Sequence, residues 1–210
     1  MFEVWGRATS SNVQAVMWTL GELGLDDRVT RHDRGHAFGG LDTPEYLAMN
    51  PHGRVPTFRD GDGPALWESA AVVRYLAARY GDAAFWPADP AARAPLDMWA
   101  EWIKTGFGPA FAQGVFWPFL RGGVPTAEAV EACAAGARLL DARLGEGPWL
   151  DGETFRWADV LTGHLLYRWY TLDWARPDLP ALSAYYDRLK ARPAFARHVM
   201  VDYAVLATPA

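Results

Sequence analysis

Residues 50–58, Asn-Pro-His-Gly-Arg-Val-Pro-Thr-Phe, constrain the fold more than any other stretch of the chain. Pro51 and Gly53 end any helix that precedes them, because both residue types disfavour helical continuation. Pro56 then stands at the start of a short apolar strand, where a residue without an N–H is tolerated. Taken alone, Pro56 favours a trans bond, but a proline in a tight turn before a strand is also a candidate for a cis Val55–Pro56 bond. A cis bond would turn the backbone N–H and C=O of Val55 outward, free to pair with an extended ligand.

The residues that follow predict a β-hairpin and then a helix. Residues 58–63 end one strand in a Gly/Asp turn, and residues 65–67 begin a second strand. A helix is predicted over 70–80, because its apolar residues recur at helical spacing. Ser69 is placed as the N-cap, where free N–H groups and the positive end of the helix dipole favour a carboxylate. A plain helix cap without a ligand explains Ser69 equally well.

Taken together, these elements resemble the glutathione-binding half of the cytosolic glutathione S-transferases. In that family the pattern is Asn-Pro-x-Gly-Lys/Arg-Val/Ile-Pro, then a hairpin, then Glu-Ser-x-Ala-Ile/Val-x-x-Tyr-Leu. Residues 50–56 and 68–76 follow both parts of this pattern, and the hairpin separates them. Because several linked elements match at the right spacing, the resemblance is specific.

The resemblance implies a role for each residue of the matched stretches. The backbone of Val55, beside cis Pro56, would pair with the cysteinyl part of glutathione. Glu68 and Ser69 would hold the γ-glutamyl amino and carboxylate groups. Arg54 takes the position of the lysine or arginine that meets the glycyl carboxylate.

Composition indicates a chain that can bury a core. Of its 210 residues 50% are hydrophobic and 21% are charged, which argues against disorder. A net charge of −5 and a pI near 5.5 argue against nucleic acid as the main partner. No apolar run reaches membrane-spanning length, and the N-terminus lacks the features of a signal peptide, so we expect a cytoplasmic protein without a membrane partner. The single cysteine, Cys133, excludes an internal disulfide and is interpreted as a small buried hydrophobic residue.

The order of predicted elements gives the fold class. A strand, a helix over 13–24 and a second, parallel strand precede the short helix, the hairpin and the helix described above. This order predicts an α/β thioredoxin-like N-terminal domain, and the strand signals stop after it. The predicted domains are therefore 1–82, a linker over 83–92, and an all-α domain over 93–210, an architecture that resembles a glutathione transferase throughout.

One capping motif of the helical domain departs from the family pattern. Residues 152–159 resemble the Ser/Thr-x-x-Asp capping box that precedes a buried helix, but Arg156 stands where Ser or Thr is usual. Asp159 is therefore given a local structural role rather than a catalytic one.

The family's task is to bind glutathione and lower the pKa of its thiol, because only the thiolate is a good nucleophile. In theta- and nu-like members a serine or threonine after the first strand donates a hydrogen bond to the sulfur. Counting from the helix position filled here by Gln14 gives Ser10, and Asn12 matches the second sulfur-side donor of nu-like bacterial members. Ser11 competes with Ser10 for this role, and a simple N-cap cluster would explain the polar run without a ligand. The loop holds no tyrosine or cysteine, so the serine type remains.

The second substrate is expected between the Ser10 loop and the first helices of the helical domain. Its candidate walls, which inter-helix packing would explain equally well, are Phe107, Phe111, Phe116 and Trp117. The resemblance weakens at residues 39–41, Gly-Gly-Leu, where nu-like members often have Gly-Gly-Gln. His36 and His52 could contribute to the glutathione site, but both are interpreted as solvated loop residues.

The resulting prediction is a serine-type, theta/nu-like glutathione transferase that conjugates or reduces small electrophiles in detoxification. Glutathione is the expected cosubstrate, a homodimer is implied by the resemblance, and no metal is expected because the histidines lack paired ligand spacing. The alternatives are a glutathione-dependent disulfide or peroxide reductase, which the Ser10–Asn12 pairing would suit, and a non-catalytic ligand-binding protein of the same fold.

Overall fold

A four-stranded mixed sheet in the order β2-β1-β3-β4 forms the centre of the N-terminal part of the computed structural model, which describes residues 1–207. The strands are β1 (Phe2–Trp5), β2 (Val29–His32), β3 (Thr57–Asp60) and β4 (Leu66–Trp67). β1 pairs in parallel with β2, with Trp5 opposite His32, and β3 is antiparallel to both β1 and β4. This is the thioredoxin-like arrangement that the sequence predicts.

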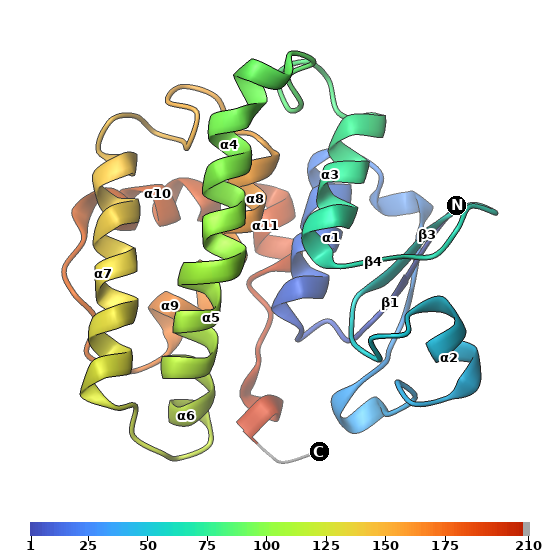
Figure 1. Ribbon diagram of the computed structural model, residues 1–210, viewed down its shortest axis with the longest axis horizontal. Helices are drawn as coiled ribbons and strands as arrows, with labels where there is room; N and C mark the ends of the chain where they lie inside the picture. Colours follow the sequence, from blue (N-terminus) through green and yellow to red (C-terminus); the bar gives the residue numbers. More distant parts are fainter. Residues whose placement is uncertain (208–210) are drawn as a thin grey trace. The chain divides into compact units, whose positions relative to one another are not determined.

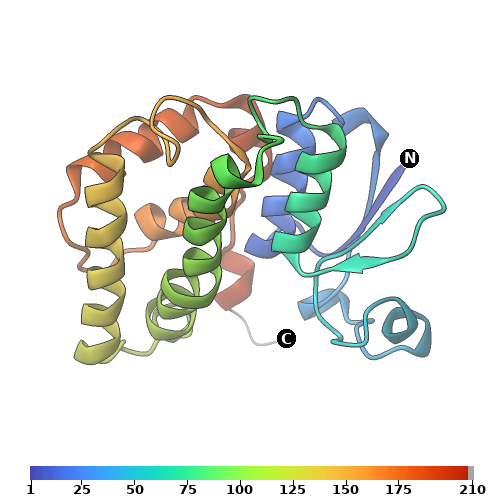
Figure 2. The same cartoon turned by 45° about the horizontal axis from the view of Figure 1, so that its top comes forward.

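Three helices accompany this sheet: α1 (Ser11–Glu22), α2 (Pro44–Met49) and α3 (Ser69–Tyr80). α1 and α3 lie side by side against one face of the sheet, and α2 lies on the other side (Figures 1 and 2). The apolar core between the sheet and these two helices consists of Phe2, Val4, Val13, Val16, Leu20, Phe58, Val72 and Leu76. Because this core fixes α1 and α3 against the strands, it also fixes where their N-termini point.

By its contacts the chain divides into two compact units, residues 1–80 with 194–207, and residues 81–193. The predicted boundaries placed residues after 193 in the helical domain, whereas the contacts group them with the first unit. The reason is α11 (Pro193–His198), whose Phe195 is buried with its ring 4.9 Å from the ring of Trp18 on α1. Asp26 also accepts a hydrogen bond from Arg197 at 3.0 Å.

The second unit is helical, as predicted. Its helices are α4 (Pro90–Trp102), α5 (Gly108–Phe111), α6 (Trp117–Leu120), α7 (Ala127–Leu144), α8 (Trp157–Gly163), α9 (Leu166–Thr171) and α10 (Pro180–Lys190). α4, α5 and α6 form one continuous column, and α7 runs alongside it (Figure 1). No helix within residues 1–207 has both the length and the apolar character needed to cross a bilayer.

Two π-helical turns, Ile103–Phe107 and Ala112–Phe116, join the three parts of that column. Each is followed at its second position by a proline, Pro109 or Pro118, which has no N–H to donate to the helical ladder. At the first turn, the N–H of Gly108 donates to the C=O of Ile103, where any side chain on Gly108 would collide with that oxygen. The interruption predicted over 106–109 is therefore a change in hydrogen-bond register within a continuing helix.

Asp159 lies at the buried start of α8. Its carboxylate accepts hydrogen bonds from the N–H of Leu150 at 3.0 Å, the N–H of Arg156 at 2.8 Å and the hydroxyl of Tyr185 at 3.0 Å. Burial raises the pKa of this carboxyl to about 6. The local role predicted for Asp159 is confirmed, and the Arg156 side chain bonds outward to Asp151 and to the C=O of Ala84.

Candidate functional site

A cavity of about 100 Å³ opens in the first unit where α1, the turn before β3 and the start of α3 meet. Its lining residues are Asn12, Asn50, His52, Arg54, Val55, Pro56, Trp67, Glu68 and Ser69. Six of the seven predicted site residues are among them, and the exception is Ser10. The structure therefore brings together residues from three separate parts of the sequence.

The wall formed by Val55 and Pro56 has the geometry that the family resemblance predicted. The Val55–Pro56 bond is cis. The backbone N–H and C=O of Val55 make no hydrogen bond to any other residue within 1–207. Both groups are thus left for a ligand in the cavity.

A buried polar network holds this wall in place. Asn50 donates through Nδ2 to the C=O of Arg54 at 2.7 Å and to Oγ1 of Thr57 at 3.1 Å. The hydroxyl of Tyr46 donates to the same Arg54 C=O at 2.6 Å, and Asn50 Oδ1 accepts from the N–H of His52 at 3.1 Å. Burial raises the pKa of Tyr46, so this hydroxyl stays a donor. The turn is therefore fixed by the side chains of Asn50, which also lines the cavity, and of Tyr46, which does not.

The start of α3 forms the opposite wall. The helix begins at Ser69, and its first bond runs from the N–H of Val72 to the C=O of Glu68 at 3.0 Å. Glu68, rather than Ser69 as predicted, therefore holds the N-cap position, and Ser69 is the first helical residue. Glu68 has a φ of 67°, a left-handed conformation that costs a residue with a Cβ about 1–3 kcal/mol and is typical of functional sites.

Two predicted site residues from distant parts of the sequence make direct contact. The hydroxyl of buried Ser69 donates to Oδ1 of Asn12 at 3.1 Å. This bond links the first turn of α1 to the first turn of α3. The positive ends of both helices consequently meet at the cavity.

Ser10 lies at the N-cap of α1, two residues before Asn12. Its backbone C=O accepts the first helical bond, from the N–H of Gln14 at 2.8 Å, while its hydroxyl makes no capping bond. The residue is 7% exposed, and its hydroxyl has no hydrogen-bond partner within residues 1–207. An available hydroxyl at the positive end of a helix can donate to an anion.

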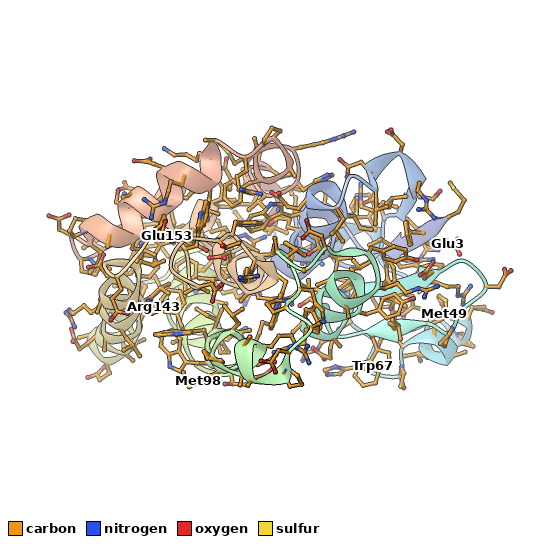
Figure 3. The ribbon with its side chains drawn as sticks, turned by 90° about the horizontal axis from the view of Figure 1, so that it is seen from above. Glu3, Met49, Trp67, Met98, Arg143 and Glu153 are labelled. Atoms are coloured by element: carbon orange, nitrogen blue, oxygen red, sulfur yellow. The ribbon has the colours of Figure 1, made fainter. Side chains whose placement is uncertain are left out.

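Three lining residues, Asn50, His52 and Trp67, were not among the predicted site residues. His52 is half-exposed as predicted, but its Nδ1 lies 3.6 Å from Oε1 of Glu68 and its ring centroid 6.3 Å from that of Trp67. Trp67 points outward at the end of β4 (Figure 3). Asn50 belongs to the matched motif, which could have indicated its role, whereas His52 occupies the motif's variable position.

The aromatic residues considered as walls of a second site are mostly core. Phe107, Phe111 and Phe116 are buried, and the first two pack on Trp169 with ring centroids 5.5 and 5.3 Å apart. Cys133 is buried as predicted, and burial raises the pKa of its thiol to about 12, so the nucleophilic thiolate form is disfavoured. Residues 1–207 contain no cluster of three or more metal-ligating side chains.

Comparisons with known proteins agree with this geometry. Residues 9–79 match the family model described as glutathione S-transferase, N-terminal domain. The chain is 35% identical to glutathione S-transferase GstB of Escherichia coli K12 over 211 residues, covering 96% of this chain and 99% of that protein. It is 29% identical to the disulfide-bond oxidoreductase YfcG of the same organism, covering 89% of each. A theta class glutathione S-transferase from Xanthomonas axonopodis pv. citri, solved with glutathione bound, is 40% identical with a TM-score of 0.85, covering 96% of this chain and 98% of that one.

Proposed function

The chain belongs to the glutathione S-transferase family, and we propose that it binds glutathione in the cavity of its first unit and activates the thiol with Ser10. The observation that carries this proposal is the convergence of the lining residues, since Asn12, Val55 and Ser69 come from three distant segments. The glutathione-bound relative from Xanthomonas, similar over nearly the whole chain, supports it.

The cavity offers a partner to each charged or polar part of glutathione. The unpaired backbone of Val55 would pair with the cysteinyl residue as a short antiparallel bridge. The first N–H groups of α3 would bind the γ-glutamyl carboxylate, and the Ser69 hydroxyl would turn from Asn12 to donate to it. Glu68 would bind the ammonium group. Arg54, an exposed cation at the other end of the wall, would meet the glycyl carboxylate.

Ser10 would lower the thiol pKa in two ways. Its hydroxyl, which bonds to no described residue, would donate to the sulfur and stabilise the anion. The N-terminus of α1 adds about 0.3–1 kcal/mol of favourable dipole interaction with a negative charge. The thiolate then forms a C–S bond with the electrophilic carbon, and the leaving group departs with its bonding electron pair.

Ultraviolet titration of bound glutathione tests this role directly. In the wild type we expect the thiol pKa to fall below the free value of about 8.5, and in Ser10→Ala to return toward it with binding mostly retained. Ser11→Ala is the matched control and should resemble the wild type. Saturable binding with an unshifted pKa would instead indicate a ligand-binding protein, and an effect of Ser11→Ala alone would move the role to Ser11.

Disulfide reduction is a second candidate. It is favoured by the similarity to YfcG and by Asn12, which lies with Ser10 at the start of α1 and lines the cavity. In this reaction two glutathione molecules are oxidised to their disulfide while the substrate disulfide is reduced to two thiols. Incubation with a small disulfide and quantification of oxidised glutathione would separate the two activities. Stoichiometric oxidation without any conjugate of a standard electrophile would favour the reductase.

We further propose that the working protein is a cytoplasmic homodimer without a metal and that its second substrate is a small electrophile. Family membership supports these proposals. Light scattering on the purified protein should give twice the mass of the 210-residue chain. Treatment with a chelator should leave turnover unchanged.

A further inference from the structure

Arg7 lies on the loop between β1 and α1, three residues before Ser10. Its C=O accepts from the N–H of Ser10 at 3.1 Å, and its N–H donates to the C=O of Arg34 at 3.2 Å. The residue is thus tied to the loop that carries the thiol-activating hydroxyl and to the segment after β2. Here the carboxyl ends of two parallel strands meet, the edge at which open α/β sheets bind ligands.

The Arg7 guanidinium has no anionic partner among residues 1–207. Its Nε is buried and makes no hydrogen bond, and it forms no ion pair with a described carboxylate. Neighbouring arginines differ, since Arg31 pairs with Asp33 and Arg59 lies 3.8 Å from Glu3. Burial lowers the pKa of Arg7, with no opposing charge to compensate.

The backbone around Arg7 leaves room for this side chain. A Cβ on Gly35 would stand 3.2 Å from Nη1 of Arg7, and Gly35 has a φ of 78°, which a side chain rarely tolerates. The guanidinium therefore packs against bare backbone. A half-buried cation with no opposing charge is costly unless an anion pairs with it.

We propose that Arg7 binds a carboxylate of a substrate beside the thiol site, an inference that rests on the proposed transferase function. The planar guanidinium donates two parallel hydrogen bonds to a carboxylate, a geometry that a neutral ester cannot match. Two molecules in the reaction can supply the carboxylate: glutathione, through its glycyl end, and the electrophile.

The experiment compares each acid with its ester. Turnover is measured with glutathione or its glycyl ethyl ester as thiol, and with 4-chloro-3-nitrobenzoate or its methyl ester as electrophile. In each reaction the thiolate forms a C–S bond at the chlorinated carbon and chloride leaves with the bonding pair. Because the acid-to-ester ratio of kcat/KM is taken within one protein sample, it does not depend on the fraction of folded enzyme.

The variants are Arg7→Met, Arg7→Lys and the control Arg28→Met, an exposed arginine before the opposite end of β2. Arg7→Met should lower the acid-to-ester ratio for one substrate by about tenfold, the effect of losing a charged hydrogen bond. Arg7→Lys should keep part of the wild-type acid-to-ester ratio, and Arg28→Met should keep the wild-type value. The substrate whose ratio changes is the one that Arg7 binds.

Unchanged ratios for both substrates in an active Arg7→Met protein would overturn the inference and leave the proposed function intact. An equal decrease for acid and ester would also overturn it, because that pattern indicates a structural role. Absence of wild-type turnover with all four substrate pairs would overturn the proposed function, and the inference with it.

Discussion

Ser10 stands at the N-cap of α1, yet its hydroxyl makes no bond to the helix. A serine at this position ordinarily accepts from an N–H of the first turn and stabilises the helix. The same role is filled at α7 by Thr126, whose Oγ1 accepts from the N–H of Ala129 at 3.2 Å. At the residue scale, the hydroxyl of Thr126 therefore stabilises its helix, whereas the hydroxyl of Ser10 is available to a ligand.

Substitution of the two hydroxyls should have opposite consequences. Ser10→Ala should change the free energy of unfolding by less than about 0.5 kcal/mol, because no capping bond is lost, while Thr126→Ala should lower it by about 1 kcal/mol. Turnover should fall only in Ser10→Ala. Urea denaturation and steady-state kinetics on both variants would test this, and a large stability loss in Ser10→Ala would show that the hydroxyl caps the helix after all.

His52 should position the Glu68 carboxylate for the γ-glutamyl ammonium group. Because both side chains are about half exposed, their interaction is weak, and His52→Ala should raise the KM for glutathione about two- to fivefold with kcat unchanged. His36→Ala, in a separate glycine-lined groove, is the control. Glutathione lacking its α-amino group should not distinguish His52→Ala from wild type; equal KM values for intact glutathione would refute the role.

At the element scale, α8 depends on one buried carboxylate. Asp159 caps the helix by accepting from the N–H of Arg156, and it also accepts from Leu150 and Tyr185. Removing this carboxylate would therefore leave three donors without a partner at once. Burial outweighs these bonds and raises the pKa of Asp159 to about 6. The native state therefore holds this proton more tightly than the unfolded chain does.

Because the native pKa of Asp159 is raised, the stability that this group contributes should fall as the pH rises. Raising the pH from about 4 to 6 should remove about 2 kcal/mol of stability through this group, since the unfolded carboxyl ionises near 3.9. Asp159→Ala should lower stability by several kcal/mol and abolish this slope. Denaturation curves at several pH values would test it. At Asp60 burial acts to raise the pKa, but the bonds from Tyr80 and Tyr75 and nearby positive charges together lower it, so this group should cost stability only as the pH falls below about 4.

The sequence predicted elements better than it predicted their junctions. The 50–58 stretch located the cavity wall because proline and glycine restrict the backbone whatever the surroundings. The π turns before Pro109 and Pro118 were not predicted, because apolar periodicity survives a one-residue shift in hydrogen bonding. The partner of His52 was missed because it depends on the left-handed backbone of Glu68, which no residue type signals.

At the scale of the whole molecule, the chain returns to its first unit after the helical one. The contact between Phe195 and Trp18 was not predicted, because the sequence does not tell which distant helix covers a buried side chain. This contact places the C-terminal segment in the same unit as the proposed glutathione site. The stability of that unit therefore depends on residues at both ends of the sequence.

Phe195→Ala should lower the free energy of unfolding by about 3–5 kcal/mol, because it leaves a cavity beside Trp18. Arg197→Ala, which removes only an exposed pair with Asp26, should cost less than about 1 kcal/mol. Thermal or urea unfolding would compare the two. Similar small losses in both would show that α11 contributes little to the first unit.

The carbonyl of Arg54 accepts hydrogen bonds from both Asn50 and Tyr46. The main chain at this position is thus held by two other residues, while the Arg54 side chain extends into solvent without a structural task. In a library that randomises this turn, selection for folded protein should accept nearly any residue at position 54 and reject changes at Asn50. Substitutions at position 54 can therefore change which ligand group this turn binds, while the backbone of the turn stays the same.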